Sequence, residues 1–128
     1  MRFYMSRMLN GGFDEVIQRT TEALKAEGFG ILTDIDVRET MKKKLGIDWR
    51  PYRILGACNP PLAHQALQAE DKIGTMLPCN VIVQDIGGGK IEVAAIDPST
   101  SMAHVGNAAL VGLAAEVRGK LEAVLDRL

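Results

Sequence analysis

Apolar residues recur at helical spacing in two long stretches of the chain. In the first, an apolar stripe runs from Phe13 to Leu24, and Gly28 follows where a left-handed C-terminal cap is expected. The second covers roughly residues 107–127, where apolar positions repeat at intervals of four and three, namely Leu110, Ala114, Val117, Leu121, Val124 and Leu128. Both stretches are predicted to be helices, and the second is the longest of the chain.

The longest predicted helix also carries a row of small residues beside its apolar stripe, namely Ala108, Gly112, Ala115 and Gly119. Glycine inside a helix costs ~1 kcal/mol relative to alanine, so two glycines on one side indicate that another backbone comes close. That backbone belongs either to the sheet of the same chain or to a second copy in a homodimer. The sheet is favoured, because fewer than three heptads is short for a coiled coil.

Alternation of apolar and polar residues predicts strands in the rest of the chain. Residues 30–37 alternate, with Asp34 and Asp36 on a face that water reaches. Four further strands are predicted, at residues 2–8, 51–58, 79–83 and 91–96. The last two flank Gly87-Gly88-Gly89, which predicts a hairpin; a phosphate-binding loop is rejected because a strand, not a helix, follows the glycines.

Two short helices complete the predicted order of elements. Asp36 and Glu39 have capping-box spacing ahead of residues 37–45, and Asn59-Pro60 is a favourable start for a helix over residues 60–69. The order β-α-β-α-β-α-β-β-α predicts an α+β fold: a two-layer sandwich with a mixed or mainly antiparallel sheet and helices on one face. A length of 128 residues predicts a single domain, 1–128.

Composition narrows the classes of protein to which the chain can belong. Its 47% hydrophobic and 24% charged residues are typical of a soluble domain, and its net charge of −1 argues against nucleic acid as a partner. No apolar run approaches the ~18 residues that span a bilayer, and the N-terminus lacks the apolar core of a signal peptide. We therefore expect no membrane partner, a cytoplasmic location and two free thiols.

Two cysteines, each followed by asparagine, stand at strand ends. Cys58-Asn59 ends the strand 51–58, and Cys79-Asn80 begins the strand at 79, with prolines beside both. If these two strands run antiparallel, the two corners lie at the same end of the sheet, whereas a parallel pair would place them at opposite ends. A shared site at the cysteines therefore requires the antiparallel arrangement.

Two functions fit such a shared site. The first is a binding or sensing module for a small molecule, with a pocket near Cys58 and Cys79 and the amides of Asn59 and Asn80 as polar contacts. The alternative is a thiol-dependent enzyme or redox protein, with Cys79 as nucleophile, Cys58 as resolving thiol and His64 as base. The binding module is favoured, because no acidic residue in the sequence is identified as a partner that would orient His64.

Two further expectations concern the burial of Cys58 and metal binding by the cysteines and histidines. Alternation places Cys58 on the same strand face as Tyr52 and Ile54, which predicts that its side chain is buried as a small hydrophobe. A Cys2His2 metal site formed with His64 and His104 is rejected, because the sequence has no closely spaced ligand pair. We expect no metal, and the residues indicate no particular cofactor.

The cysteine segments also resemble a known family. Gly28-Phe29-Gly30, the strand end at Asp34-Val37, the segment from Arg50 to Ala63 and Leu77-Pro78-Cys79-Asn80-Val81 are similar to domain-of-unknown-function family 302. The likeness runs from about Phe13 to the last helix. The resemblance implies a small prokaryotic α+β protein and a homodimer, and it implies no reaction.

Overall fold

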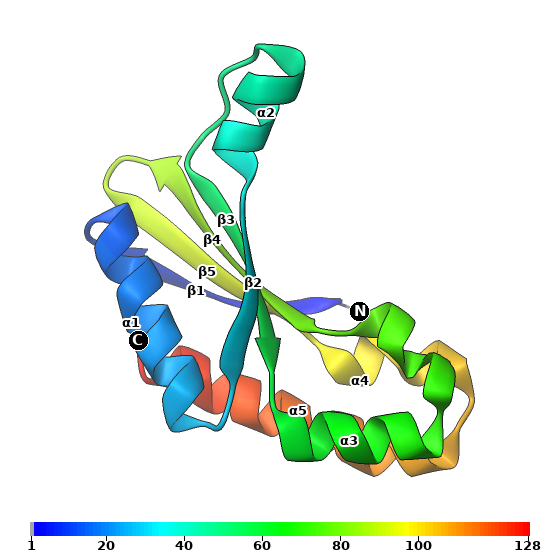
Figure 1. The fold of residues 1–128 in the computed structure, drawn as a ribbon. Coiled ribbons are helices and arrows are strands. Elements are labelled where there is room, and N and C mark those ends of the chain that lie inside the picture. Colours follow the sequence, from blue (N-terminus) through cyan, green and yellow to red (C-terminus); the bar gives the residue numbers. More distant parts are fainter. Residues whose placement is uncertain (1) are drawn as a thin grey trace.

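A five-stranded antiparallel sheet is the centre of the fold (Figure 1). The computed structural model describes residues 2–128. The strands lie in the order β1-β5-β4-β3-β2, and every neighbouring pair is antiparallel. Their bounds are β1 Tyr4–Asn10, β2 Gly30–Asp36, β3 Tyr52–Cys58, β4 Cys79–Gly87 and β5 Lys90–Ile96. The predicted hairpin is confirmed as β4 and β5, whereas the predicted first strand lies two residues further along the chain.

The helices form where the sequence predicted them, with three short additions. The longer helices are α1 Phe13–Ala26, α2 Val37–Leu45, α3 Pro60–Ala69 and α5 Ala108–Asp126. The connections that the sequence left irregular contain the short elements η1 Asp71–Met76, α4 Pro98–Ser101 and η2 Ala103–Val105. The predicted α+β sandwich is confirmed, with a sheet that is antiparallel throughout.

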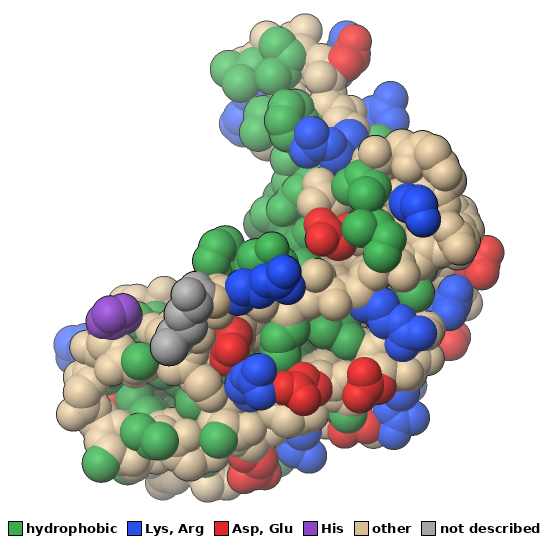
Figure 2. Space-filling model, turned by 180° about the vertical axis from the view of Figure 1, so that it is seen from behind, with side chains coloured by type: hydrophobic (Ala, Val, Ile, Leu, Met, Phe, Trp, Pro, Cys, Tyr) green, Lys and Arg blue, Asp and Glu red, His purple; other side chains and the backbone are tan. Residues whose placement is uncertain are grey.

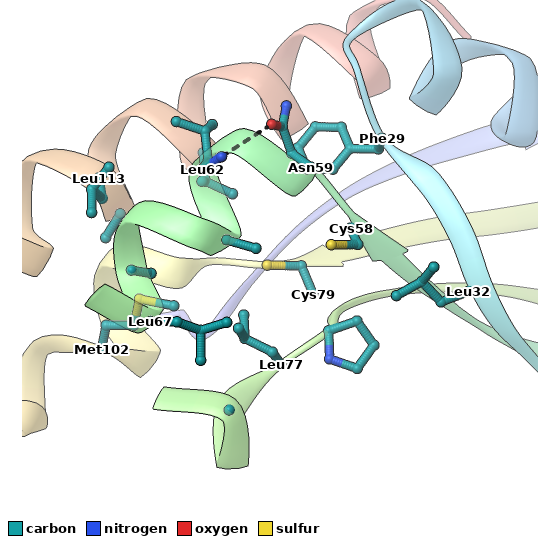
Figure 3. Close-up of a pocket in the computed structure, with 16 residues that line it drawn as sticks. Phe29, Leu32, Cys58, Asn59, Leu62, Leu67, Leu77, Cys79, Met102 and Leu113 are labelled. Atoms are coloured by element: carbon teal, nitrogen blue, oxygen red, sulfur yellow. Dashed lines mark hydrogen bonds between the residues drawn. The ribbon is translucent and has the colours of Figure 1, made fainter. Parts of the chain in front are cut away.

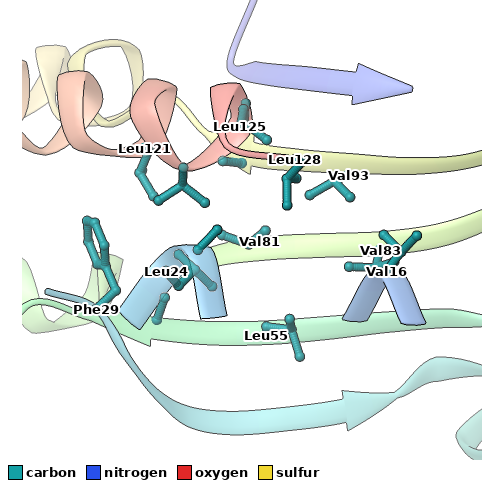
Figure 4. Close-up of a cluster of buried hydrophobic side chains, with 14 of the residues drawn as sticks. Val16, Leu24, Phe29, Leu55, Val81, Val83, Val93, Leu121, Leu125 and Leu128 are labelled. Carbon is teal, nitrogen blue, oxygen red and sulfur yellow. The ribbon is translucent and has the colours of Figure 1, made fainter. Parts of the chain in front are cut away.

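The main core lies between one face of the sheet and the helices α1 and α5 (Figure 4). Alternate residues of the three central strands point into it, among them Leu55, Val81 and Val93. Leu24 of α1 and Leu121 of α5 are fully buried against them. Since burying one such side chain contributes roughly 1.5–3 kcal/mol, this cluster is the main source of stability.

The small-residue row of α5 does not meet any part of the described chain closely. All four of its residues are exposed, and a methyl group placed on Gly112 or Gly119 would have no neighbour within 4 Å. The favoured prediction, that the row packs on the chain's own sheet, is therefore wrong. The parallel stripe that begins at Leu110 makes that contact instead.

The edge strand β2 departs from simple alternation because it contains a bulge. Ile31 pairs with Ala57 and Thr33 pairs with Gly56, so Leu32 is an extra residue without a partner. A bulge shifts every later side chain to the other face. The predicted pattern holds only up to Ile31, and beyond it each side chain lies on the face opposite to the predicted one.

Asp34, expected to be simply solvated, binds the neighbouring strand. Arg53 donates two hydrogen bonds to its carboxylate, at 2.8 and 2.6 Å. These hydrogen bonds hold the pKa of Asp34 below its usual value of 3.8, because they favour the charged form. The pair joins β2 to β3 at the base of the segment that leaves the sheet next.

That segment, residues 37–51, projects from the body and is called the arm below (Figures 1 and 2). It consists of α2 and the extended return to β3. The helix is well capped: Asp36 accepts a hydrogen bond from the Glu39 backbone at 2.9 Å, and Gly46 ends it in the left-handed conformation. No residue of α2 is fully buried, and Val37, Thr40 and Met41 are half-buried in a helix that contacts the body through β3.

Candidate ligand-binding hollow

A hollow of about 350 Å³ lies beside the main core, between the ends of β3 and β4 and the helices α3 and α5 (Figure 3). Leu62 and Ala66 of α3 form one wall, and Leu113 and Val117 of α5 form another. A smaller cluster around Ile73 and Leu110 packs at the far end of α3. The hollow occupies the space that the main core and this second cluster leave between them.

The two cysteines both line this hollow. Strands β3 and β4 are antiparallel, and Ala57 lies opposite Cys79, so Cys58 and Cys79 are diagonal neighbours at one end of the sheet. Figure 3 shows both sulfur atoms pointing into the same space. The antiparallel arrangement that a shared site requires is therefore present.

The Cys58 side chain is half-buried. Its shielding does not come from the strand face on which alternation with Tyr52 and Ile54 places it. Tyr52 and Ile54 lie on the face of the sheet opposite the main core, which we call the open face, and the buried face carries Leu55 and Ala57. Cys58 is the last residue of β3, where the chain turns into α3. Its thiol is shielded by the walls of the hollow and not by the main core.

Cys79 is the more deeply buried thiol, with 8% of its surface exposed. Burial, and to a smaller extent the nearby Cys58, together raise its pKa from the ordinary value of 9.0 to about 11. Both causes disfavour the thiolate. At neutral pH the Cys79 side chain is therefore a neutral, apolar group and a weak nucleophile.

We expect the folded protein to react slowly with iodoacetamide at Cys79. At pH 8 a pKa of about 11 leaves roughly one hundredth of the thiolate that an ordinary cysteine would have. The measurement is the alkylation rate against pH in a Cys58→Ser background, with the denatured chain as the reference. Rapid alkylation with an apparent pKa below 8.5 would contradict this prediction and support the thiol-dependent alternative.

The same pKa predicts how stability changes with pH. The unfolded chain releases the Cys79 proton near pH 9, before the folded chain does, so the contribution of this group is complete below pH 9 and is lost between pH 9 and about 11. The loss is roughly 2–3 kcal/mol in the free energy of unfolding. Denaturant titrations should show it in the natural chain and not in Cys79→Ala.

The amide of Asn59 lines the hollow, but it is already engaged in the fold. Its Oδ1 accepts a hydrogen bond from the Leu62 backbone at 3.4 Å and caps α3, as the sequence predicted. Its Nδ2 donates to the carbonyl of Glu27 at 3.4 Å. Gly28, with φ of +87°, leaves room for this amide, since a Cβ there would lie 3.0 Å from Nδ2.

Two of the candidate residues lie outside the hollow. His64 is exposed on α3, and the hollow is lined by its neighbour Ala63 instead. Asn80 follows Cys79 directly, so alternation turns its side chain to the open face of the sheet, beside Tyr52 and Ile82. The structure thus brings together Cys58, Cys79 and Asn59.

The sequence did not indicate several residues that complete the walls. Leu32 reaches the hollow from the bulge of β2, and Met102 reaches it from the end of α4. No pattern in the sequence marks either position. Leu62 and Ala66 are buried on α3 at the spacing of an ordinary packed helix face, and this spacing does not distinguish a hollow from a filled core.

The described residues show neither a clustered metal site nor a membrane-spanning helix. Within residues 2–128, no three His, Cys, Asp or Glu side chains gather closely enough to hold a metal ion. In the same range, no helix has the length and apolar character needed to cross a bilayer.

Comparison with known proteins places the chain in a family. The family model described as "Domain of unknown function DUF302" matches residues 5–128. The chain belongs to the DUF302 family. A crystal structure of an uncharacterized conserved DUF302 protein from Bacillus stearothermophilus is similar, with a TM-score of 0.92 and 33% identity. The match covers 99% of this chain and 98% of that one. No curated protein matches this chain.

Family membership agrees with the cysteine segments that suggested it. The matched range contains both Cys-Asn corners, four whole strands and all of β1 except Tyr4. Every residue that lines the hollow lies within it. The Bacillus protein supports the fold and the prokaryotic character of this DUF302 chain.

Proposed function

We propose that this DUF302 protein is a small-molecule binding module whose ligand is uncharged and largely apolar. The lining of the hollow carries this proposal. Among the described residues that form it, the side chains are hydrocarbon or sulfur-containing except for Asn59. The Asn59 amide is already used for the α3 cap and the Glu27 carbonyl.

The chemistry of this lining selects the ligand class. A charged group placed in an apolar hollow loses its hydration and gains no compensating partner there. A hydrocarbon or aromatic ring loses little and displaces water from carbon surfaces. The volume of about 350 Å³ is at the small end of the range for ligand pockets, which suits a molecule of one to three rings or a short chain.

The thiol-dependent alternative has one observation in its favour, the convergence of Cys58 and Cys79 on one hollow. Two observations weigh against it. The raised pKa of Cys79 disfavours the nucleophilic thiolate, and His64 is exposed outside the hollow. We therefore assign Cys79 the role of a neutral wall group and not of a nucleophile, and we propose that the protein works in the reducing cytoplasm.

A fluorescence titration with N-phenyl-1-naphthylamine tests the binding function. This uncharged dye joins a phenyl ring to a naphthalene ring, and its fluorescence increases in apolar surroundings. We expect saturable binding of one molecule per chain. The matched control is 8-anilino-1-naphthalenesulfonate, which keeps the same aromatic rings and adds a charge. We expect it to bind at least about ten-fold more weakly. Equal binding of both dyes, or no saturation, would contradict the proposal.

A further inference from the structure

The hollow is elongated, because its walls follow the axis of α3. Its lining on this helix runs from Asn59 at the N-cap to Leu67, eight residues further along the chain. At a rise of 1.5 Å per residue, this stretch is about 12 Å long. Figure 3 shows the other walls extending in the same direction, from Phe29 and Leu32 near the start of α3 to Met102 near its end.

The volume and the length together give the width of the hollow. A volume of about 350 Å³ over a length of about 12 Å corresponds to a mean cross-section of about 30 Å². A hydrocarbon chain whose carbon atoms contact the walls at about 4.0–4.5 Å on every side takes up roughly 16–20 Å². One chain therefore fits lengthwise into the hollow, and two chains side by side do not.

The hollow is a groove with a buried floor and an exposed rim. Its floor includes Leu62, Ala66 and Ala114, each with 6% or less of its surface exposed. Leu32 and Leu67 form the rim, and they are 67% and 41% exposed. In the chain by itself, water contacts these two leucines at the edge of an apolar groove. A ligand that lies lengthwise in the groove removes apolar surface of both leucines from water, which favours binding.

The bulge of β2 brings Leu32 to the rim. Leu32 is the extra residue between Ile31, which pairs with Ala57, and Thr33, which pairs with Gly56. A bulge re-aims a side chain that regular pairing would place elsewhere. Leu32 belongs to neither of the two buried clusters, so the core of the fold does not use its apolar side chain. Contact with a ligand in the groove gives this leucine a role.

The walls of the groove are aliphatic along most of their length. Among the described residues of the lining, Phe29 is the single aromatic one, and it lies at one end. Aliphatic walls attract a hydrocarbon chain by dispersion and offer few ring faces for stacking. A flat molecule such as the naphthylamine dye can enter edge-on, but each of its ring systems covers only part of the length. A chain covers all of it.

We propose that the natural ligand carries one unbranched hydrocarbon chain, which lies along α3 between the buried floor and the two leucines of the rim. This inference rests on the proposed function, because it names the class of apolar ligand that the same hollow binds. The polar end of the ligand stays at the rim, since the amide of Asn59 is already used within the fold. An extended chain advances roughly 1.2 Å per bond, as the protein backbone does at up to 3.6 Å per three bonds, so about ten carbon atoms span the groove.

Displacement of N-phenyl-1-naphthylamine by straight-chain alcohols tests the length of the groove. From 1-hexanol to 1-decanol, each added carbon should lower the dissociation constant by about four-fold, because each buried CH₂ group contributes a similar free energy. From 1-decanol to 1-dodecanol the gain should fall below about two-fold per carbon, since the chain then exceeds the groove. An affinity that does not rise with length, or that rises undiminished to 1-dodecanol, would overturn the proposal.

The matched control for shape is 1-adamantanol, which has the same number of carbon atoms as 1-decanol and one hydroxyl group, but in a compact cage. After correction for the transfer of each alcohol from water to octanol, it should bind at least about ten-fold more weakly than 1-decanol. Equal corrected affinities would overturn the chain while leaving the proposed function in place, provided that the dye still saturates. Absence of saturable dye binding would overturn both.

The variant Leu32→Ser and its control Leu45→Ser test the position of the chain at the rim. Leu45 lies in the arm outside the lining of the hollow and is 66% exposed, so both substitutions remove equally exposed leucines that the core does not need. Leu32→Ser should weaken binding of 1-decanol by at least about three-fold, and Leu67→Ser should act in the same direction. Leu45→Ser should bind as the natural chain does. Equal affinities of all three variants would contradict the proposed position.

Discussion

Replacing Ala63 with tryptophan is expected to weaken binding of N-phenyl-1-naphthylamine by at least about ten-fold, which is a loss of roughly 1.4 kcal/mol. Ala63 is half-buried on α3 and its methyl group faces the hollow. An indole ring at this position occupies much of a space of about 350 Å³. The ring enters a space that is already open, so the fold should tolerate it. The measurement is the dissociation constant from the fluorescence titration, with circular dichroism to confirm folding.

The matched control changes the next residue on the same helix. His64 is exposed and lies outside the hollow, so His64→Trp adds the same ring to α3 without entering the site. It should bind the dye as the natural chain does. If Ala63→Trp and His64→Trp bind equally well, the hollow is not where the dye is held.

Replacing Gly56 with alanine should lower the free energy of unfolding by about 1–3 kcal/mol. A Cβ at this position would lie 2.1 Å from Oγ1 of Thr33 and 2.8 Å from Cγ of Pro78. The threonine hydroxyl can rotate away, but the proline ring is rigid and is held between η1 and β4. Because Pro78 also lines the hollow, the substitution should weaken dye binding too.

Gly30 provides the control for this substitution, since it stands in the neighbouring strand and has nothing within 4 Å of an added Cβ. Gly30→Ala should be neutral or slightly stabilising, because glycine within a strand costs about 0.5–1 kcal/mol. Adding Thr33→Ala to Gly56→Ala should restore part of the lost stability by removing the closest contact. Equal stability of Gly56→Ala and Gly30→Ala in denaturant titrations would show that the close approach is not important.

Local rules in the sequence were sufficient for most of the secondary structure. Asp36 and Asn59 cap their helices with their own side chains, and the ring of Pro60 fits the first helical position. Both helices begin where predicted. The glycine turn between β4 and β5 is equally local. The bulge of β2 could not be predicted, because it depends on pairing with Gly56 and not on β2 alone.

The part of the site that follows from the order and direction of the strands could be predicted from the sequence. Antiparallel pairing of β3 and β4 brings Cys58 and Cys79 together, and the short α3 connection made that pairing one of two choices. The orientation of Asn80 and the exposure of His64 depend on which sheet face is covered. The sequence suggested the wrong face for β3, because Tyr52 and Ile54 look like core residues and lie on the open face.

The open face explains this error in physical terms. Apolar residues on both sides of a central strand are typical of a sheet that is covered twice. Here only one cover, formed by α1 and α5, is supplied by the chain itself.

Methyl carbon NMR of the chain with added naphthalene tests the central claim, that an apolar ligand occupies the hollow beside Cys58 and Cys79. We predict saturable shifts at the methyl groups of Leu62, Leu113 and Val117, which form its walls. The methyl signals of Ile54 and Ile82 on the open face should not shift. Shifts concentrated on the open face, or none that saturate, would contradict the account.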